Sequence, residues 1–230
     1  MGNRAYTSLS GQAYPDITSG GGGGGGYTPT PITGLEDNAG LVLNNGATLT
    51  DGKLVLAGGT QYAALADSTG NYDKVPGQPL VISLKFKVNA ALWKQTIIGH
   101  HTGGPNYDGW VIMTNGTNID VFTNQGGNTP TASNSKTFSM TLEGGQEYGL
   151  IVVIEDSPNT ITVYVNDLKI STQTPFELPL DTSVDLWFGI QKDGATLYNP
   201  LVGEIWDIEI FQSLISAADR LDKTSGIFVT

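Results

Sequence analysis

The feature that most constrains this fold is a series of short segments in which apolar and polar residues alternate. In residues 79–88 every second side chain is apolar, and Lys85 and Lys87 occupy the opposite face. The same period of two recurs in residues 160–166 and 184–190. Because successive side chains of a strand point to opposite faces of a sheet, these segments are predicted to be strands with one buried face.

Turn residues separate the predicted strands along most of the chain. Residues 148–154 are apolar on both faces, which predicts a strand covered on both sides. About a dozen strands punctuated in this way are typical of an all-β sandwich or jelly roll. A helical turn is predicted only at 216–222, capped by Ser216 with Asp219 three residues later. The dipeptides typical of tight hairpin turns are Asn-Gly at 45–46 and 115–116, Asp-Gly at 51–52 and 193–194, and Asn-Asp at 166–167.

Residues 1–34 differ in composition from the jelly-roll domain predicted at 35–230. Seven consecutive glycines at 20–26 precede alternating threonine and proline, a composition that does not form a core of its own. We interpret 1–34 as a flexible arm that docks on a partner, and a frayed terminus or a linker is the alternative. The apolar residues that would anchor the arm are Tyr6, Leu9, Tyr14 and Ile17.

Charge and composition exclude several classes of partner. Acidic residues outnumber basic ones by 22 to 11, and the net charge is -11. Such a chain is repelled by nucleic acid and by anionic lipid surfaces. The sequence contains no cysteine, and its longest apolar runs, such as 150–154, are too short to cross a bilayer. Without a recognisable signal peptide, we expect synthesis in the cytoplasm.

Five segments, in order, resemble those of the laminin-G-like, concanavalin A-like jelly rolls. The resemblance implies two antiparallel sheets packed as a sandwich, an architecture also found in decoration and tail proteins of bacteriophage particles. The segments are ATLTDGKLVLAGGTQYAAL (47–65), PLVISLKFKV…WKQTIIGH (79–100), GQEYGLIVVIEDSPNTITVYVNDLKI (145–170), DLWFGIQ (185–191) and LVGEIWDIEIFQSLISAAD (201–219).

The segment GEIWDIEIFQ (203–212) carries three carboxylates in a spacing similar to the catalytic strand of laminarinase-like glucanases. In the resemblance, however, this segment is the closing strand. A retaining glycosidase also needs two carboxyl groups about 5 Å apart on one face. In a regular strand Asp207 and Glu209 share a face while Glu204 points the other way, unless a bulge re-aims it. We therefore expect no catalytic residues here.

The segment GHHTGGPNYDGW (99–110) is the candidate ligand surface. Aromatic faces suit the C–H groups of sugars, and amides or carboxylates suit their hydroxyls. The alternative is a turn-rich connection before a core strand. Its candidate ligand-binding residues are His100, His101, Asn106, Tyr107, Asp108 and Trp110.

The segment ADSTGNYDK (66–74) offers Asp67, Asn71 and Asp73 as oxygen ligands. Jelly rolls of the resembled type often bind calcium, but the spacing does not match an EF-hand, and a plain turn has the same composition. We expect no obligatory cofactor, with calcium as the open alternative.

These observations favour a non-catalytic protein on the surface of a bacteriophage virion, either a capsid decoration protein or a tail adhesion module. The partners would be other virion proteins, through residues 1–34, and host surface glycans, through the jelly-roll loops. A free lectin-type carbohydrate-binding module is the first alternative, and a laminarinase-like glycoside hydrolase is the second.

Overall fold

The structure is a computed structural model. The predicted arm, Asn71, Asn106, Tyr107 and the Ser216 cap all lie outside the part of the chain that it describes. The described residues are 40–67, 72–89, 94–102, 108–124, 135–174, 184–214, 220, 223 and 224.

The described residues form sixteen strands. The first eight are β1 Leu41–Asn44, β2 Thr48–Thr50, β3 Lys53–Ala57, β4 Tyr62–Leu65, β5 Leu80–Val88, β6 Lys94–His101, β7 Gly109–Asn115 and β8 Asn118–Asn124. The remainder are β9 Ser135–Phe138, β10 Glu147–Asp156, β11 Asn159–Val165, β12 Leu168–Gln173, β13 Leu186–Phe188, β14 Gln191–Asp193, β15 Thr196–Tyr198 and β16 Val202–Phe211.

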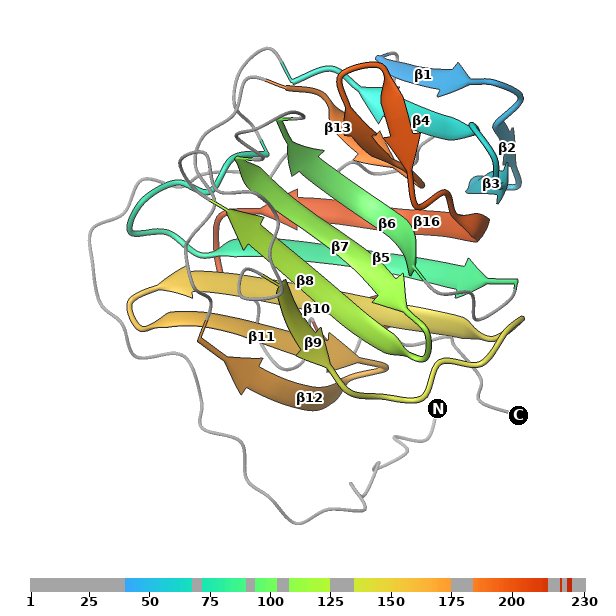
Figure 1. Ribbon diagram of the computed structural model, residues 1–230. Helices are drawn as coiled ribbons and strands as arrows, with labels where there is room; N and C mark the ends of the chain where they lie inside the picture. The colour runs from blue at the N-terminus through green and yellow to red at the C-terminus, as the bar shows by residue number, and fades with distance from the viewer. Residues whose placement is uncertain are drawn as a thin grey trace, which may run out of the picture.

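Two seven-stranded antiparallel sheets pack face to face, which confirms the predicted sandwich. Sheet 1 has the order β1-β4-β13-β6-β7-β8-β9 and is the nearer layer in Figure 1. Sheet 2, behind it, has the order β12-β11-β10-β5-β16-β3-β2. The strands β14 and β15 form a separate hairpin after β13. Closing strand β16 lies between β5 and β3.

The core lies between the two sheets. The alternation predicted for β5 is present, since Leu80, Ile82, Leu84 and Phe86 are fully or almost fully buried and join one large apolar cluster. Matching residues of β7, β11 and β16 enter the same cluster. At about 25 cal/mol per Å² of apolar surface, this burial is the main stabilising contribution to the fold.

The strand that is apolar on both faces, β10, is covered on both sides as predicted. Its outward residues Ile151 and Val153 form a second cluster with Phe211 and neighbouring side chains. Thr224 packs on Gly149, where a Cβ would lie 2.9 Å from the Thr224 Cα. Thr224 and Lys223, which lies over Phe211, therefore cover part of the outer face of sheet 2.

Two of the predicted hairpin turns have positive φ at both residues, which matches the twist of the paired strands that they join: Asp51–Gly52 between β2 and β3, and Asn166–Asp167 between β11 and β12. Asn45 and Gly46 also have positive φ, but they connect β1 and β2, which belong to different sheets. At 115–116 and 193–194 only the glycine has positive φ. Among the described residues no helix has the length and apolar character needed to cross a membrane.

Candidate functional site

The closing strand β16 is not regular, which corrects the expectation for its carboxylates. Its pairing with β5 shifts between Trp206 and Glu209, and Asp207 has φ of 50°. One extra residue at this bulge reverses the alternation after it. Glu204 and Glu209 therefore share the outer face of sheet 2, instead of pointing to opposite faces.

These carboxylates face lysines. The Glu204 carboxylate lies 2.7 Å from the Lys87 Nζ and 3.6 Å from the Lys53 Nζ. The hydrogen bond from Lys87 holds the pKa of Glu204 below its usual range. Asp207 pairs with Lys85 at 2.9 Å, and Glu209 pairs with Lys223. A general acid needs a raised pKa and a nearby partner carboxylate. At Glu204 the neighbouring lysines lower the pKa instead, which does not suit a general acid.

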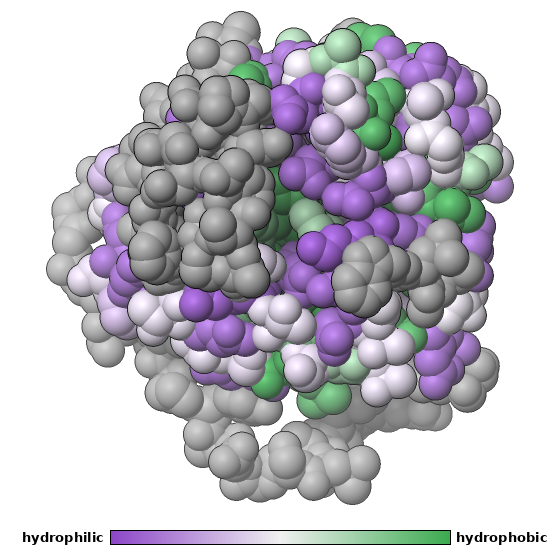
Figure 2. Space-filling view, viewed as in Figure 1, coloured by the Kyte–Doolittle hydropathy of each residue, from purple (hydrophilic) through white to green (hydrophobic). Residues whose placement is uncertain are grey.

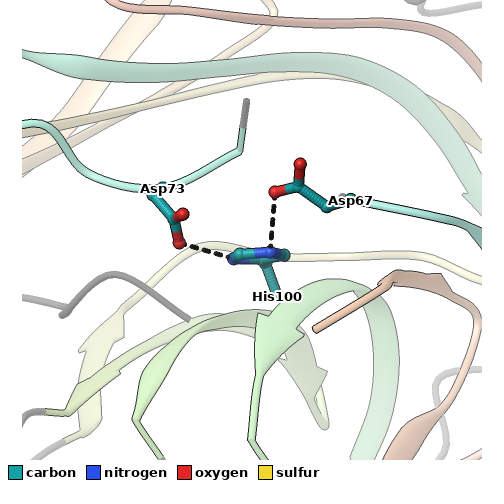
Figure 3. Close-up of side chains that lie close together, drawn as sticks. All are labelled: Asp67, Asp73 and His100. Carbon is teal, nitrogen blue, oxygen red and sulfur yellow. Dashed lines mark ion pairs between the residues drawn. The ribbon is translucent and has the colours of Figure 1, made fainter. Parts of the chain in front are cut away.

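A second group of carboxylates is buried inside the sandwich. Asp67 follows β4, Asp73 precedes β5, and His100 lies near the end of β6 (Figure 3). The side chains of Asp67 and His100 are fully buried, and that of Asp73 is 5% exposed. The imidazole of His100 lies between the two carboxylates, with Nε2 3.2 Å from Asp67 Oδ2 and Nδ1 3.5 Å from Asp73 Oδ1.

Neighbouring groups hold this cluster in place. The Nε2 of His100 lies 2.9 Å from the Val184 carbonyl oxygen, and the Tyr72 amide donates to Asp67 Oδ2 over 3.2 Å. The indole N–H of Trp110 donates to the Tyr72 carbonyl. Burial lowers the pKa of His100, against the opposing effect of Asp67. Burial also raises the pKa of Tyr72 to about 12.

Asp67, Asp73 and His100 are also the residues that could hold a metal ion. One ligand atom from each lies within 4.8 Å of the others. Of the predicted oxygen ligands, Asp67 and Asp73 are thus brought together, while Asn71 lies outside the described residues. The proximity of His100 to these two carboxylates was not predicted. A buried histidine flanked by turn carboxylates has no local signature, because the contact depends on how β4, β5 and β6 pack.

Strand alternation divides the predicted ligand-binding residues between two sides of sheet 1. His100 and the fully buried Trp110 pair across β6 and β7 and point into the sandwich. His101 points outward. Asp108 directly precedes β7, and its amide donates to the hydroxyl of Thr102, which follows β6. Asn106 and Tyr107 lie outside the described residues.

The outward side of β6, β7 and β8 combines apolar and polar residues in cross-strand rows. Val111, Met113 and Phe122 form an apolar cluster there. Polar residues occupy the rows on either side of the central one. The rows are Thr96–Met113–Asp120, Gly99–Val111–Phe122 and His101–Gly109–Asn124.

Three polar atoms on this face are buried and have no hydrogen-bond partner within the part of the chain that the structure describes. They are Thr96 Oγ1, His101 Nε2 and Asp120 Oδ1. The Nδ1 of His101 faces the Thr102 carbonyl at 3.0 Å and must donate, since a carbonyl oxygen only accepts. Burial lowers the pKa of His101, so its Nε2 carries a lone pair. Each buried atom left in this state costs about 1–3 kcal/mol.

The β14–β15 hairpin borders this face beside β6. Its Asp193 interacts electrostatically with His101, and its Lys192 ammonium lies 4.2 Å from the ring centre of Trp187. Figure 2, viewed from the sheet 1 side, shows mainly hydrophilic residues around a hollow with hydrophobic surface inside it. Thr96 and Asp120 could not be predicted as site residues, because polar residues on the outward side of a strand normally contact water.

No protein-family model matches the sequence, and no curated protein matches it. Solved structures do resemble the fold. The binding domain of botulinum neurotoxin DC in complex with rat synaptotagmin II has a TM-score of 0.59 at 15% identity, over 83% of this chain and 47% of that one. The botulinum neurotoxin C1 binding domain has a TM-score of 0.61 at 15% identity, over 83% and 48%.

A third similar structure is described with the words "Cell entry of botulinum neurotoxin type C is dependent upon interaction with two ganglioside molecules". Its TM-score is 0.61 at 17% identity, over 83% of this chain and 47% of that one. The chain thus spans about half the length of these structural neighbours. At such low identity the likeness establishes one thing, that this chain has the same β-sandwich fold as part of these binding domains.

Proposed function

We propose that this chain is a non-catalytic recognition module that binds glycans through the outer face of sheet 1. One observation carries the proposal: three buried polar atoms on that face, Thr96 Oγ1, His101 Nε2 and Asp120 Oδ1, have no hydrogen-bond partner. Sugar hydroxyls supply donors to such atoms, and the apolar row between them suits the C–H face of a sugar ring.

Two further observations support recognition over catalysis. The acidic residues of β16 face lysines, so the glucanase-like spacing does not produce a raised pKa at Glu204. The structural neighbours are binding domains, and those described with synaptotagmin II or with gangliosides recognise cell-surface molecules. A shared fold gives associational support only.

The three polar atoms are closed to solvent in the ligand-free protein, since Thr96 is 0%, His101 2% and Asp120 3% exposed. Binding therefore requires neighbouring side chains to shift by enough to admit hydroxyl groups. This cost reduces affinity for a single sugar. The rows of Thr96 and His101 lie several residues apart along the strands, so an extended oligosaccharide reaches both rows and a monosaccharide reaches one.

The test is a glycan array probed with the full-length chain and three variants. We expect a defined set of oligosaccharides to bind, and we expect His101→Gln and Asp120→Asn to lose most of that binding. Glu204→Gln, on the other sheet, is the control and should bind as the wild-type chain does. Absence of glycan binding by the folded wild-type chain would contradict the function, and binding unchanged in both face variants would move the site elsewhere.

We further propose that the module acts on the surface of a bacteriophage particle, docked through residues 1–34. The support comes from the sequence: an apolar-anchored arm that cannot form its own core, and an acidic domain without cysteine. Deleting residues 2–34 should leave the unfolding midpoint and glycan binding unchanged while abolishing association with particles. Particle association that survives the deletion would contradict the docking role.

A further inference from the structure

We propose that the glycans bound by the outer face of sheet 1 carry a free amino group, as unacetylated hexosamines do, and that Asp120 selects them by pairing with the ammonium. This inference rests on the proposed glycan recognition and adds the class of sugar to it. Its basis is a buried carboxylate on β8 whose charge is not matched by any ion pair of the described residues.

The two oxygens of Asp120 differ in their partners. Its Oδ2 accepts a hydrogen bond from the Asn115 side chain over 2.8 Å, whereas Oδ1 is buried and has no hydrogen-bond partner in the described part of the chain. The residue is 3% exposed, so its carboxylate is largely removed from water. A buried carboxylate in this state is costly, because no ion pair offsets the loss of its hydration. The site therefore favours a ligand that brings a positive charge.

The lysines closest to Asp120 in the sheet do not pair with it. Lys136 on the neighbouring strand β9 is opposite Val121, whose side chain enters the core, so Lys136 points to the other side of sheet 1. Lys94 lies on β6, with β7 between it and Asp120. The Lys192 ammonium lies over the ring of Trp187, beyond β6. The cation that matches Asp120 has to come from a ligand.

The surroundings of Asp120 suit a sugar ring that carries this cation. Phe122 lies two residues along β8, roughly 6.6 Å away on the same face, and clusters with Met113. One pyranose ring with its substituents spans such a distance, so a ring whose C–H groups rest on Phe122 places an amino group at Asp120. Across the sheet Asp120 lies between Met113, a flexible side chain, and the exposed Thr137 of edge strand β9. A shift of Met113 opens Oδ1 toward the ligand.

An ammonium is favoured at this oxygen over a hydroxyl or an acetamide. All three groups donate hydrogen bonds, but only the ammonium also neutralises the carboxylate, and Coulomb attraction is stronger in a buried site than in water. A carboxylate or sulfate on the sugar would be repelled both by Asp120 and by the net charge of -11. The selected class is thus glycans of unacetylated glucosamine or galactosamine.

The test is calorimetry with the full-length chain at about pH 6, where the sugar amines are protonated. Tetrasaccharides of glucosamine and of galactosamine are each compared with their N-acetylated forms. We expect at least one free amine to bind about 10-fold more tightly than its acetylated form. Asp120→Asn, which keeps an oxygen for the Asn115 hydrogen bond, should remove this preference. Asp207→Asn, which removes the same charge from an exposed side chain on sheet 2, should retain it.

A second measurement needs no variant, should Asp120→Asn fail to fold. Binding of the free amine by the wild type should weaken about 10-fold when the pH is raised to about 9, where the amine is neutral, while binding of the acetylated form should not change. Binding of the free amine that does not depend on pH would overturn the inference. Tetralysine is the control for attraction of any cation and should bind about 10-fold more weakly than the free amine.

The outcomes separate this inference from glycan recognition itself. Acetylated forms that bind as tightly as the free amines, or a preference that persists in Asp120→Asn, would overturn the role of Asp120 and leave glycan recognition standing. Tetralysine that binds more tightly than every glycan, with the binding lost in Asp120→Asn, would assign the face to a basic peptide and overturn both proposals. Absence of binding by all of these glycans and across the glycan array would also overturn both.

Discussion

The outer faces of the two sheets differ in how their charged and buried polar groups are paired. On sheet 2, Glu204 stands against Lys87 and Lys53, and Lys223 lies over Phe211 of the outer apolar cluster. Arg220 Nε and Asp167 Oδ1 have no hydrogen-bond partner among the described residues, but they carry opposite charges 3.8 Å apart. On sheet 1, a similar apolar cluster is accompanied by the buried Asp120 Oδ1, which has no hydrogen-bond partner.

The contrast teaches where stability and recognition are located in this sandwich. A face whose charges are matched and whose apolar residues are covered by the chain itself stabilises the fold. A face that retains unsatisfied buried polar groups is less stable than it could be, which is typical of binding sites.

The largest effect is expected from the packing of sheet 2. Phe211 is 5% exposed and lies in the outer cluster, with the Lys223 ammonium 5.5 Å from the ring centre. Phe211→Ala should lower the free energy of unfolding by about 3–5 kcal/mol, measured by urea denaturation. Leu168→Ala, on a side chain that is 64% exposed, is the control and should change it by less than about 0.5 kcal/mol. Similar losses in both variants would show that the C-terminal segment does not cover a packing face.

Neutralising one carboxylate on each face should have opposite effects on stability. Glu204→Gln removes ion pairs to Lys87 and Lys53 and should destabilise the fold by about 1 kcal/mol. Asp120→Asn keeps an oxygen for the hydrogen bond from Asn115 and removes a buried charge, so it should stabilise the fold by about 1 kcal/mol. Urea unfolding midpoints compare the two. Destabilisation by both substitutions would remove the distinction between the faces.

Acid should weaken the matched face through Glu204. The folded pKa of this carboxyl lies below the usual 4.5, chiefly because of Lys87. The unfolded chain therefore binds the proton more readily, so this contribution is fully present above about pH 4.5 and is lost as the pH falls through the folded pKa. Unfolding midpoints from pH 7 to pH 3 should fall less steeply for Lys87→Met than for the wild type. Equal slopes would contradict the assignment.

The smallest effect is expected at a partly exposed ion pair on the same face. Lys223→Gln removes the ion pair with Glu209, which is partly exposed, and should cost less than about 1 kcal/mol. The difference from the wild type should shrink at high salt, because screening weakens such a pair. A loss that does not depend on salt would instead assign the contribution of Lys223 to its contact with Phe211.

Much of the fold followed from local patterns. The alternation in 79–88 and 160–166 corresponds to β5 and β11, and the segment apolar on both faces became β10, covered on both sides. The regular alternation assumed for β16 was wrong, because the bulge at Asp207 moves Glu209 onto the same face as Glu204. The position of a bulge depends on how the strand fits between its neighbours, so it could not be predicted from the residues within the strand.

The class of fold followed from the sequence, because a period of two and turn dipeptides are local properties. Which side chains meet depends on the tertiary structure. Asp67, Asp73 and His100 lie on separate connections and strands and come together through the packing of β4, β5 and β6. Thr96 and Asp120 differ from ordinary outward residues only because neighbouring groups bury them. Burial and long-range contact are properties of the assembled sheets, and no short segment encodes them.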